Sequence, residues 1–159
     1  MSNVTLPQEL MNEAIAAARR GIASGQSPFG CAIALGGKVI AVEHNTVWLT
    51  TDVTAHAEIN ALRAACATAS NIHLEGALVA TTCEPCPMCM AALHWARVGE
   101  VHFGATIADA AHAGFNELQL SAADVLRLGQ SSVNLMGDCL RAECQALFAE
   151  WKSASGRSY

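Results

Sequence analysis

The sequence predicts an α/β fold, a three-layer α/β/α sandwich around a five-stranded mixed sheet. Three observations lead to this fold class. Apolar runs of strand length alternate with segments of helical spacing, 52% of the residues are hydrophobic, and only 5% of the 159 residues are aromatic. Such an aliphatic composition suits close packing of helices on a sheet. A chain of this length is expected to form one domain, residues 1–159.

The first predicted helix spans residues 6–23. Thr5 fits an N-cap, Pro7 a first-turn proline and Gln8 a capping-box partner. Apolar residues then recur at helical spacing up to the end of this segment.

The remaining elements follow from the same periodicity rules. Gly36 and Gly37 join two apolar runs and supply the positive φ angles that a two-residue hairpin turn requires. The predicted strands are 29–35, 38–44, 76–82, 100–105 and 132–136. The predicted helices are 55–70, 87–97, 122–128 and a last one with an apolar stripe of Leu140, Cys144, Leu147, Phe148 and Trp151.

Charge and hydropathy narrow the class of partner. The formal net charge is −5, and the nine Lys and Arg residues are spread along the chain without a cluster. This balance argues against nucleic acid and against an anionic membrane surface, and it favours a small neutral molecule. Residues 1–7 show no basic segment followed by an apolar run, and no charge-free apolar stretch reaches the length of a membrane span. We therefore expect a cytoplasmic protein.

Seven cysteines, an odd number, indicate reduced thiols or metal ligands rather than a disulfide framework. Three of them, Cys83, Cys86 and Cys89, lie close together in the chain. The other four stand in apolar stretches and are expected to fill the core: Cys31, Cys66, Cys139 and Cys144.

Two short segments carry the residue types of a metal site, His-Ala-Glu at 56–58 and Pro-Cys-Pro-Met-Cys at 85–89. Each falls in the first turn of a predicted helix. Cys86 and Cys89 are three residues apart and share a helix face, and a helix N-terminus favours the thiolate. With His56 they would give zinc three ligands and leave a fourth position for water, which is typical of a catalytic site.

Glu58 would then stand close to the metal without binding it. A carboxylate in that place can act as general base and acid, so the predicted reaction is hydrolytic. A fourth ligand from Cys83 is rejected, because it would close the coordination sphere. Either segment alone is weak evidence, and a redox-active Cys pair or a purely structural zinc module remain the alternatives. Together, in this order, they match the signature of zinc deaminases.

Further motifs point to one family. They are Pro-Phe-Gly at 28–30, His-Asn at 44–45, Thr-Ala-His-Ala-Glu at 54–58, Cys-Glu-Pro-Cys-Pro-Met-Cys at 83–89, Trp-Ala-Arg at 95–97 and Asp-Ala-Ala-His-Ala-Gly-Phe at 109–115. With them the chain resembles the cytidine deaminase-like superfamily and, through the last motif, its bacterial guanine deaminases. The resemblance implies one catalytic zinc ion per subunit on His56, Cys86 and Cys89, with Glu58 moving protons.

The resemblance also implies a substrate pocket. Asn45 would hydrogen-bond a purine, and Phe29 and Trp95 would pack on it. Glu117 would accept hydrogen bonds from the N1–H and the 2-amino group of the purine. Tyr159, the last residue, could cover the active site of a neighbouring subunit. A carboxylate accepts two parallel hydrogen bonds, and guanine offers two adjacent donors where adenine offers one beside an acceptor, so Glu117 favours guanine.

For each of these five residues the sequence leaves an ordinary structural role open. Phe29 and Trp95 could belong to the core, and Asn45 could be a turn residue. Glu117 could cap the helical segment after Leu120 or face solvent, and a chain terminus commonly frays.

We therefore predict a zinc-dependent aminohydrolase that converts guanine to xanthine and ammonia, a step of purine metabolism. Other aminated heterocycles, such as cytosine or an aminotriazine, are alternative substrates, and adenosine in tRNA is a further one. The superfamily usually forms dimers or larger assemblies, so we expect a homodimer, with the 91–95 helix segment supplying contacts.

Overall fold

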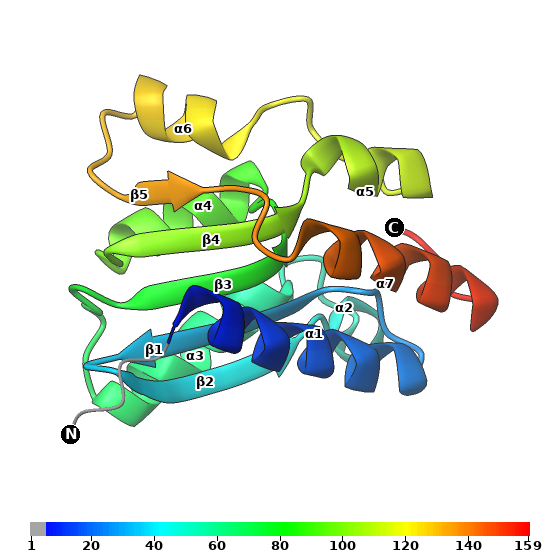
Figure 1. Cartoon of the computed structure of the whole chain (residues 1–159), viewed down its shortest axis with the longest axis horizontal. Helices are drawn as coiled ribbons and strands as arrows, with labels where there is room; N and C mark the ends of the chain where they lie inside the picture. The colour runs from blue at the N-terminus through cyan, green and yellow to red at the C-terminus, as the bar shows by residue number, and fades with distance from the viewer. Residues whose placement is uncertain (1–5) are drawn as a thin grey trace.

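A five-stranded sheet runs through the middle of the molecule in the order β2-β1-β3-β4-β5 (Figure 1). The computed structural model describes residues 6–159. Strand β1 pairs antiparallel with β2 and with β3, whereas β3, β4 and β5 run parallel, which confirms the predicted mixed sheet. The strands are β1 (Gly30–Leu35), β2 (Lys38–His44), β3 (Leu78–Cys83), β4 (Glu100–Ala105) and β5 (Asn134–Met136).

Helices cover both faces of the sheet (Figure 1), as the sequence predicts. One layer holds α1 (Pro7–Ala23) and α7 (Arg141–Ser153), with α5 (Ile107–Ala113) beside α7. The other layer holds α3 (Ala57–Ala69), α4 (Pro87–Trp95) and α6 (Ala122–Leu128), and a short helix, α2 (Val47–Thr50), follows β2. None of the helices within residues 6–159 combines the length and the apolar content needed to span a bilayer.

Glycine allows α1 to lie directly against the start of β1. A Cβ atom on Gly30 would collide with the backbone oxygen of Ala14 and would also meet the backbone nitrogen of Ala18. Because glycine has no side chain, helix and strand can approach this closely. The N-terminus of α1 differs in detail from the prediction, since Glu9 and not Gln8 accepts the Leu6 backbone N–H, at 3.1 Å. The predicted cap Thr5 lies outside the described residues.

One edge of the sheet gathers the chain segments that carry the motifs. Strands β2, β3 and β4 run in the same direction, so their carboxyl ends meet at this edge, together with the beginning of the antiparallel β1. Ligands of open α/β sheets bind outside the carboxyl ends of the strands. Three residues separate the end of β3 from the start of α4, and the N-terminus of α3 lies beside it.

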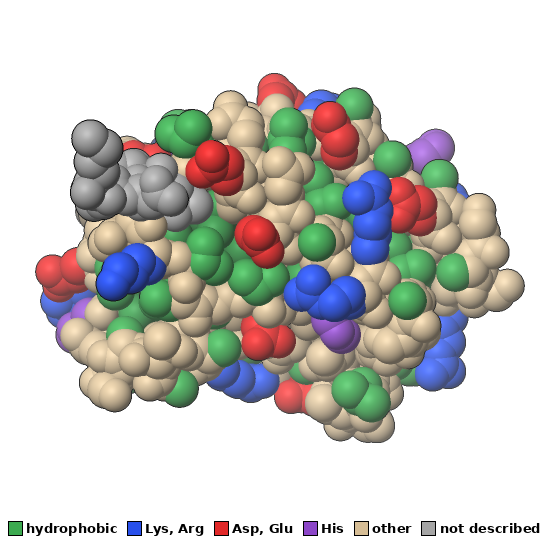
Figure 2. All heavy atoms as spheres, turned by 60° about the horizontal axis from the view of Figure 1, so that its bottom comes forward, with side chains coloured by type: hydrophobic (Ala, Val, Ile, Leu, Met, Phe, Trp, Pro, Cys, Tyr) green, Lys and Arg blue, Asp and Glu red, His purple; other side chains and the backbone are tan. Residues whose placement is uncertain are grey.

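Charged side chains are mixed over the surface. On the face shown in Figure 2, Lys and Arg stand among Asp and Glu and do not gather into one basic patch. This distribution agrees with the scattered basic residues of the sequence.

Candidate active site

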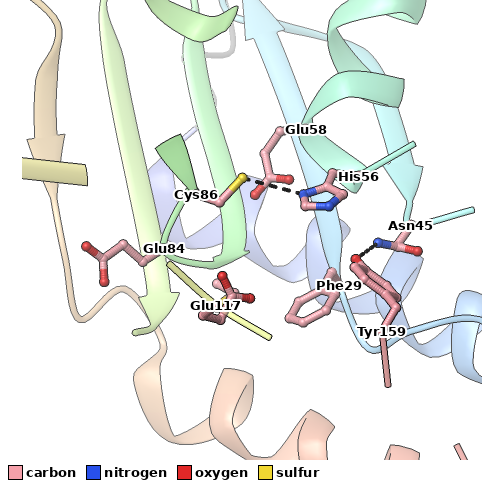
Figure 3. A pocket seen from close by; sticks show the side chains of 9 residues that line it. Phe29, Asn45, His56, Glu58, Glu84, Cys86, Glu117 and Tyr159 are labelled. Atoms are coloured by element: carbon pink, nitrogen blue, oxygen red, sulfur yellow. Dashed lines mark hydrogen bonds between the residues drawn. The ribbon is translucent and has the colours of Figure 1, made fainter. Parts of the chain in front are cut away.

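Two helix N-termini bring the predicted metal ligands together. His56 is the N-cap of α3 and Cys86 the N-cap of α4, and neither side chain caps its own helix. Nδ1 of His56 lies 3.6 Å from Sγ of Cys86 and 3.5 Å from Sγ of Cys89 (Figure 3). The three ligand atoms all lie within 4.8 Å of one another.

The geometry and charge of this group fit zinc. A tetrahedral zinc site with zinc–sulfur distances of ~2.3 Å and zinc–nitrogen distances of ~2.0 Å has sulfur–nitrogen edges of ~3.5 Å. A hydrogen bond from Cys89, together with His56, lowers the pKa of Cys86 to about 4, and the same hydrogen bond raises the pKa of Cys89. Metals bind thiolates and neutral imidazole, so a deprotonated Cys86 beside Cys89 and His56 forms a donor set suited to a divalent cation.

Cys83 stands apart from this group. Its thiol donates to the backbone oxygen of Thr106 at 3.5 Å, and burial raises its pKa well above the usual value. Among residues 6–159 the metal-ligating group consists of one imidazole and two thiols, so one tetrahedral position is left for another ligand.

Glu58 lies in the first turn of α3 and is almost fully buried, with 6% of its surface exposed. Its Oε1 accepts a hydrogen bond from the Thr81 hydroxyl at 2.7 Å, and its Oε2 lies 3.5 Å from Cys89 Sγ. Burial raises the pKa of this carboxyl group. The side chain therefore stands beside the metal ligands without belonging to their group.

A pocket opens from the metal ligands to the surface. Its inner part is a cavity of about 20 Å³, and an outer groove of about 310 Å³ adjoins it. His56, Cys86, Glu117 and Tyr159 line both parts. The inner cavity is lined by Phe29, Asn45, His56, Glu58, Cys83, Glu84, Cys86, Glu117 and Tyr159.

Tyr159 lies in the pocket of its own chain. Its hydroxyl accepts a hydrogen bond of 2.6 Å from Nδ2 of the buried Asn45 (Figure 3), and its backbone oxygen accepts from the N–H of Asn116 at 3.1 Å. Burial raises the pKa of the phenol. Oδ1 of Asn45 accepts from the Val47 N–H at 3.0 Å, so the turn role that the sequence left open for Asn45 is also present.

Glu117 is half-buried beside the metal ligands. Its carboxylate accepts no hydrogen bond within residues 6–159, and burial and the charge of Cys86 raise its pKa. It does not cap the following helix, because Ser121 accepts from Asp124 N–H there. Of the alternatives for Glu117, helix capping is therefore excluded.

The two aromatic residues predicted to pack on a substrate differ. Phe29 lines the inner cavity, where its ring packs edge-on against Phe115 at 4.9 Å between centroids. Trp95 does not line it, and the residue is 73% exposed. Trp95 lies six positions after Cys89, and at 3.6 residues per turn this places it on a different side of α4. The prediction that Trp95 contacts a substrate in this pocket is therefore wrong. The alternative, that Trp95 belongs to the core, is also wrong, because the residue is exposed.

Comparison with known proteins decides the family. Residues 4–105 match the profile of the cytidine and deoxycytidylate deaminase zinc-binding region. The chain belongs to this family. It is accordingly a zinc-dependent hydrolytic deaminase, as the sequence predicts, and the group of His56, Cys86 and Cys89 provides the arrangement for its metal.

The deaminase is similar to proteins of two activities. It is 40% identical over 111 residues to the guanine deaminase of Bacillus subtilis (strain 168), covering 69% of this chain and 71% of that protein. It is also 40% identical over 95 residues to the tRNA-specific adenosine deaminase of Agrobacterium fabrum, covering 60% of this chain and 62% of that protein. A solved structure of the guanine deaminase from Nitrosomonas europaea superposes with a TM-score of 0.84 at 27% identity, covering 93% of this chain and 85% of the other.

Two residues of this deaminase site escape sequence reasoning. Thr81 holds Glu58, and Glu84 lines the inner cavity. The signal for Thr81 is a polar residue inside an otherwise apolar strand. The signal for Glu84 is an acidic residue between a buried strand and the helix that carries Cys86 and Cys89.

Proposed function

We propose that this deaminase converts guanine to xanthine and ammonia. The observation that carries the proposal is the Glu117 carboxylate, which lines the pocket beside the metal ligands without a hydrogen-bond partner within residues 6–159. Two adjacent N–H donors, such as N1–H and the 2-amino group of guanine, would satisfy it. Adenine places an acceptor next to its amino donor and would leave one carboxylate oxygen against a lone pair. The similarity to guanine deaminases supports the same substrate.

The residues around the cavity suit hydrolysis at C2 of guanine. Zinc on His56, Cys86 and Cys89 supplies Lewis-acid activation of water near neutral pH. Glu58 accepts the proton that the attacking water loses as its oxygen bonds to C2, and delivers it to the ring nitrogen N3. It then takes the proton of the new C2 hydroxyl group and transfers it to the amino group, so that the C2–N bond breaks, ammonia leaves and the carbonyl of xanthine forms.

The walls of the pocket suit a flat base. Phe29 offers a ring to one side, and the side-chain amide of Asn45 has a second N–H beyond the one it gives to Tyr159. The inner cavity of about 20 Å³ holds about one water molecule, so the Tyr159 ring has to move before a purine can reach the metal ligands. We also propose that Tyr159 at the end of the chain closes over the bound base, either in the pocket of its own subunit or in that of a neighbouring subunit.

Electrostatics favour a free base over a nucleic acid. Glu58, Glu84 and Glu117 line the inner cavity, and neither it nor the outer groove is lined by Lys or Arg among residues 6–159. A phosphate would therefore find no cationic partner at the site, and the net charge of −5 gives no long-range attraction for RNA. These features count against adenosine in tRNA, the activity of some relatives.

Ammonia release from a panel of substrates tests the proposal. Guanine, cytosine, adenine, an aminotriazine and tRNA are offered to the zinc-loaded enzyme. We expect a kcat/KM for guanine at least ~100-fold above that for adenine. In Glu117→Gln the value for guanine should fall ~10-fold or more, because the amide presents a donor to a donor. Activity on another substrate without activity on guanine would refute the assignment.

We further propose that the enzyme is a homodimer that uses the exposed side of α4. Trp95 is the last residue of this helix and is 73% exposed, and together with Ala91 and Val125 it lines a groove. An exposed tryptophan next to apolar groups is typical of an interface. Sedimentation equilibrium should show a dimer for the wild type and a weakened one for Trp95→Ser. Val39→Ser, on the edge strand β2, is the matched control.

A cytoplasmic location is proposed as well. None of the seven cysteines forms a disulfide in the structure, which suits a reducing compartment. Cell fractionation with an antibody to the protein tests it.

A further inference from the structure

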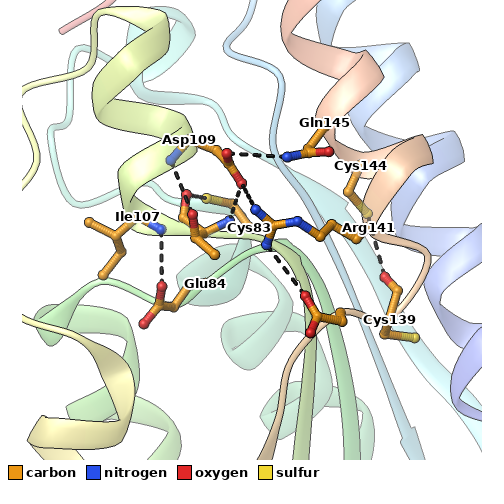
Figure 4. A network of polar contacts seen from close by, with 10 residues as sticks. Cys83, Glu84, Ile107, Asp109, Cys139, Arg141, Cys144 and Gln145 are labelled. Carbon is orange, nitrogen blue, oxygen red and sulfur yellow. Dashed lines mark hydrogen bonds and ion pairs between the residues drawn. The ribbon is translucent and has the colours of Figure 1, made fainter.

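One carboxylate joins two helix N-termini next to the metal ligands. Oε2 of Glu84 accepts the backbone N–H of Ile107 at 3.0 Å (Figure 4), and Oε1 accepts that of Ala122 at 2.9 Å. Ile107 is the first residue of α5, and Ala122 is the first residue of α6. Both oxygens of Glu84 are thus occupied by N–H donors that have no partner within their own helices.

The chain between these two points carries Glu117. Residues 107–122 comprise α5 and the loop with Phe115, Asn116 and Glu117, and Glu84 holds both ends of this segment. Glu84 itself is fixed by its place in the fold. Its backbone N–H donates to the oxygen of Ala105 at 2.8 Å, and Cys86 follows two residues later. A single side chain therefore connects the metal-ligand motif with the segment that carries the unpaired carboxylate.

We propose that Glu84 is a positioning residue for substrate recognition, which sets the place of Glu117 relative to the metal ligands. The inference rests on the proposed function of Glu117 in binding guanine. Glu84 lines the inner cavity, but both its carboxylate oxygens accept backbone N–H groups, and in Figure 3 its side chain extends away from the Cys86 sulfur and the other labelled side chains. It therefore acts through the segment and not on the substrate.

The two hydrogen bonds that Glu84 accepts from Ile107 and Ala122, called the clamp below, require a carboxylate. An amide at position 84 can accept one N–H through its oxygen, and its NH₂ group then faces the second N–H donor. Glu84→Gln therefore releases one end of the segment while it keeps the size of the side chain. Glu75→Gln is the matched control, because Glu75 is an exposed residue paired with Arg97 at 3.0 Å.

Steady-state kinetics and hydrogen exchange of the zinc-loaded enzyme test the proposal. In Glu84→Gln we expect an unchanged zinc content, a KM for guanine raised ~10-fold and a kcat within ~3-fold of the wild type, because one charge-assisted hydrogen bond is lost away from the reacting atoms. Peptides from residues 107–122 should exchange faster, whereas those from α4 should not. Glu75→Gln should match the wild type in every respect.

A second variant removes one contact from the other side. Proline is tolerated at the first position of a helix, where the N–H has no intrahelical partner. Ser121, which precedes Ala122, has an extended backbone with φ −69° and ψ 150°, as the residue before a proline requires. Ala122→Pro thus deletes the N–H that Glu84 accepts and should also raise KM. If Glu84→Gln loses zinc or does not fold, the KM of Ala122→Pro tests the positioning role of Glu84 in its place.

Coupling with Glu117 separates a positioning role from general loss of structure. In a Glu117→Gln background, Glu84→Gln should change KM less than ~2-fold, because the recognition it supports is already absent. Equal effects in both backgrounds, or unchanged KM and exchange in Glu84→Gln and Ala122→Pro, would overturn the proposal. Inactivity of the wild type on guanine would instead refute the proposed function, and the exchange of residues 107–122 would still report on the clamp.

Discussion

The hydroxyl of Thr81 donates a hydrogen bond of 2.7 Å to Oε1 of Glu58. Thr81 belongs to the central strand β3 and Glu58 to the first turn of α3, and both are buried. The other carboxylate oxygen, Oε2, lies 3.5 Å from Cys89 Sγ. The rigid strand thus fixes the orientation of the carboxylate that is proposed to move protons.

Replacing Thr81 by valine should lower kcat. Valine has the shape of threonine but no hydroxyl, so Glu58 loses a hydrogen bond to a charged group, worth roughly 1.5–3 kcal/mol. We expect kcat to fall ~10-fold or more with an unchanged zinc content. Thr81→Ser retains the donor and should keep most of the activity. Equal kcat values for the valine and serine variants would contradict this role of Thr81.

Glu58→Gln should give a folded, zinc-loaded and nearly inactive protein. The amide cannot take up a proton at neutral pH, and general acid–base catalysis typically contributes 10²- to 10⁴-fold. We expect kcat to fall within about that range, while elemental analysis still finds one zinc per chain. Wild-type rates in this variant would favour a zinc module without a catalytic role, the alternative that the sequence alone left open.

The cysteines of the motif should differ in their effect on zinc. Cys86→Ser removes a ligand and is expected to lower zinc content and activity together. Cys83→Ala should retain one zinc per chain, because the Cys83 thiol donates to Thr106 outside the ligand group. Zinc determination after dialysis against a weak chelator checks both variants. Loss of the metal from Cys83→Ala would show that Cys83 is a ligand.

Asp109 should make the stability of the protein depend on pH. Partial burial raises its pKa, but hydrogen bonds from Thr106 and Gln145 and the charge of Arg141 (Figure 4) lower it more, so the pKa in the folded state lies below the usual value. Its contribution to stability is then fully present above the unfolded-state pKa of ~3.9 and is lost as the pH falls through the folded-state value.

Urea unfolding of Asp109→Asn measures this contribution. At pH 7 the variant should be less stable than the wild type by about 1 kcal/mol, which is typical of a lost helix cap, and the difference should shrink as the solution approaches pH 3. Asp138→Asn is the control, because Asp138 pairs with the same Arg141 at 3.4 Å but is 80% exposed. A stability difference for Asp109→Asn that does not change with pH would contradict the prediction.

The long elements of the fold could be predicted from the sequence. Each has a full period of apolar residues, and the observed strands and helices agree with the predicted ones to within a few residues. The helices α2 and α5 were not predicted, because α2 has only four residues and α5 consists mainly of alanine, so neither shows a clear apolar side. Thr106 and Asp109 form a capping box that could have revealed α5.

The candidate site was predictable where its residues are close in sequence. His56, Glu58, Cys86 and Cys89 stand in two short motifs, and spacing alone places them at helix N-termini. The contacts of Thr81 with Glu58 and of Glu84 with Ala122 join residues that are far apart in the chain, and no periodicity reports them. For Trp95 the prediction was wrong although the residue is close in sequence to Cys89. The helical rotation along α4 places it on a side that does not line the inner cavity.

Gly30 has no side chain that could take part in catalysis, yet it determines how the pocket residues at the edge of the sheet are placed. Phe29 precedes it, and the Phe29 oxygen accepts the backbone N–H of Asn45 at 3.1 Å. Any larger side chain at position 30 forces α1 and β1 apart and disturbs both pocket residues at once. In a genetic screen for loss of activity, substitutions of Gly30 would therefore be recovered alongside those of the zinc ligands, and only a stability measurement would tell the two groups apart.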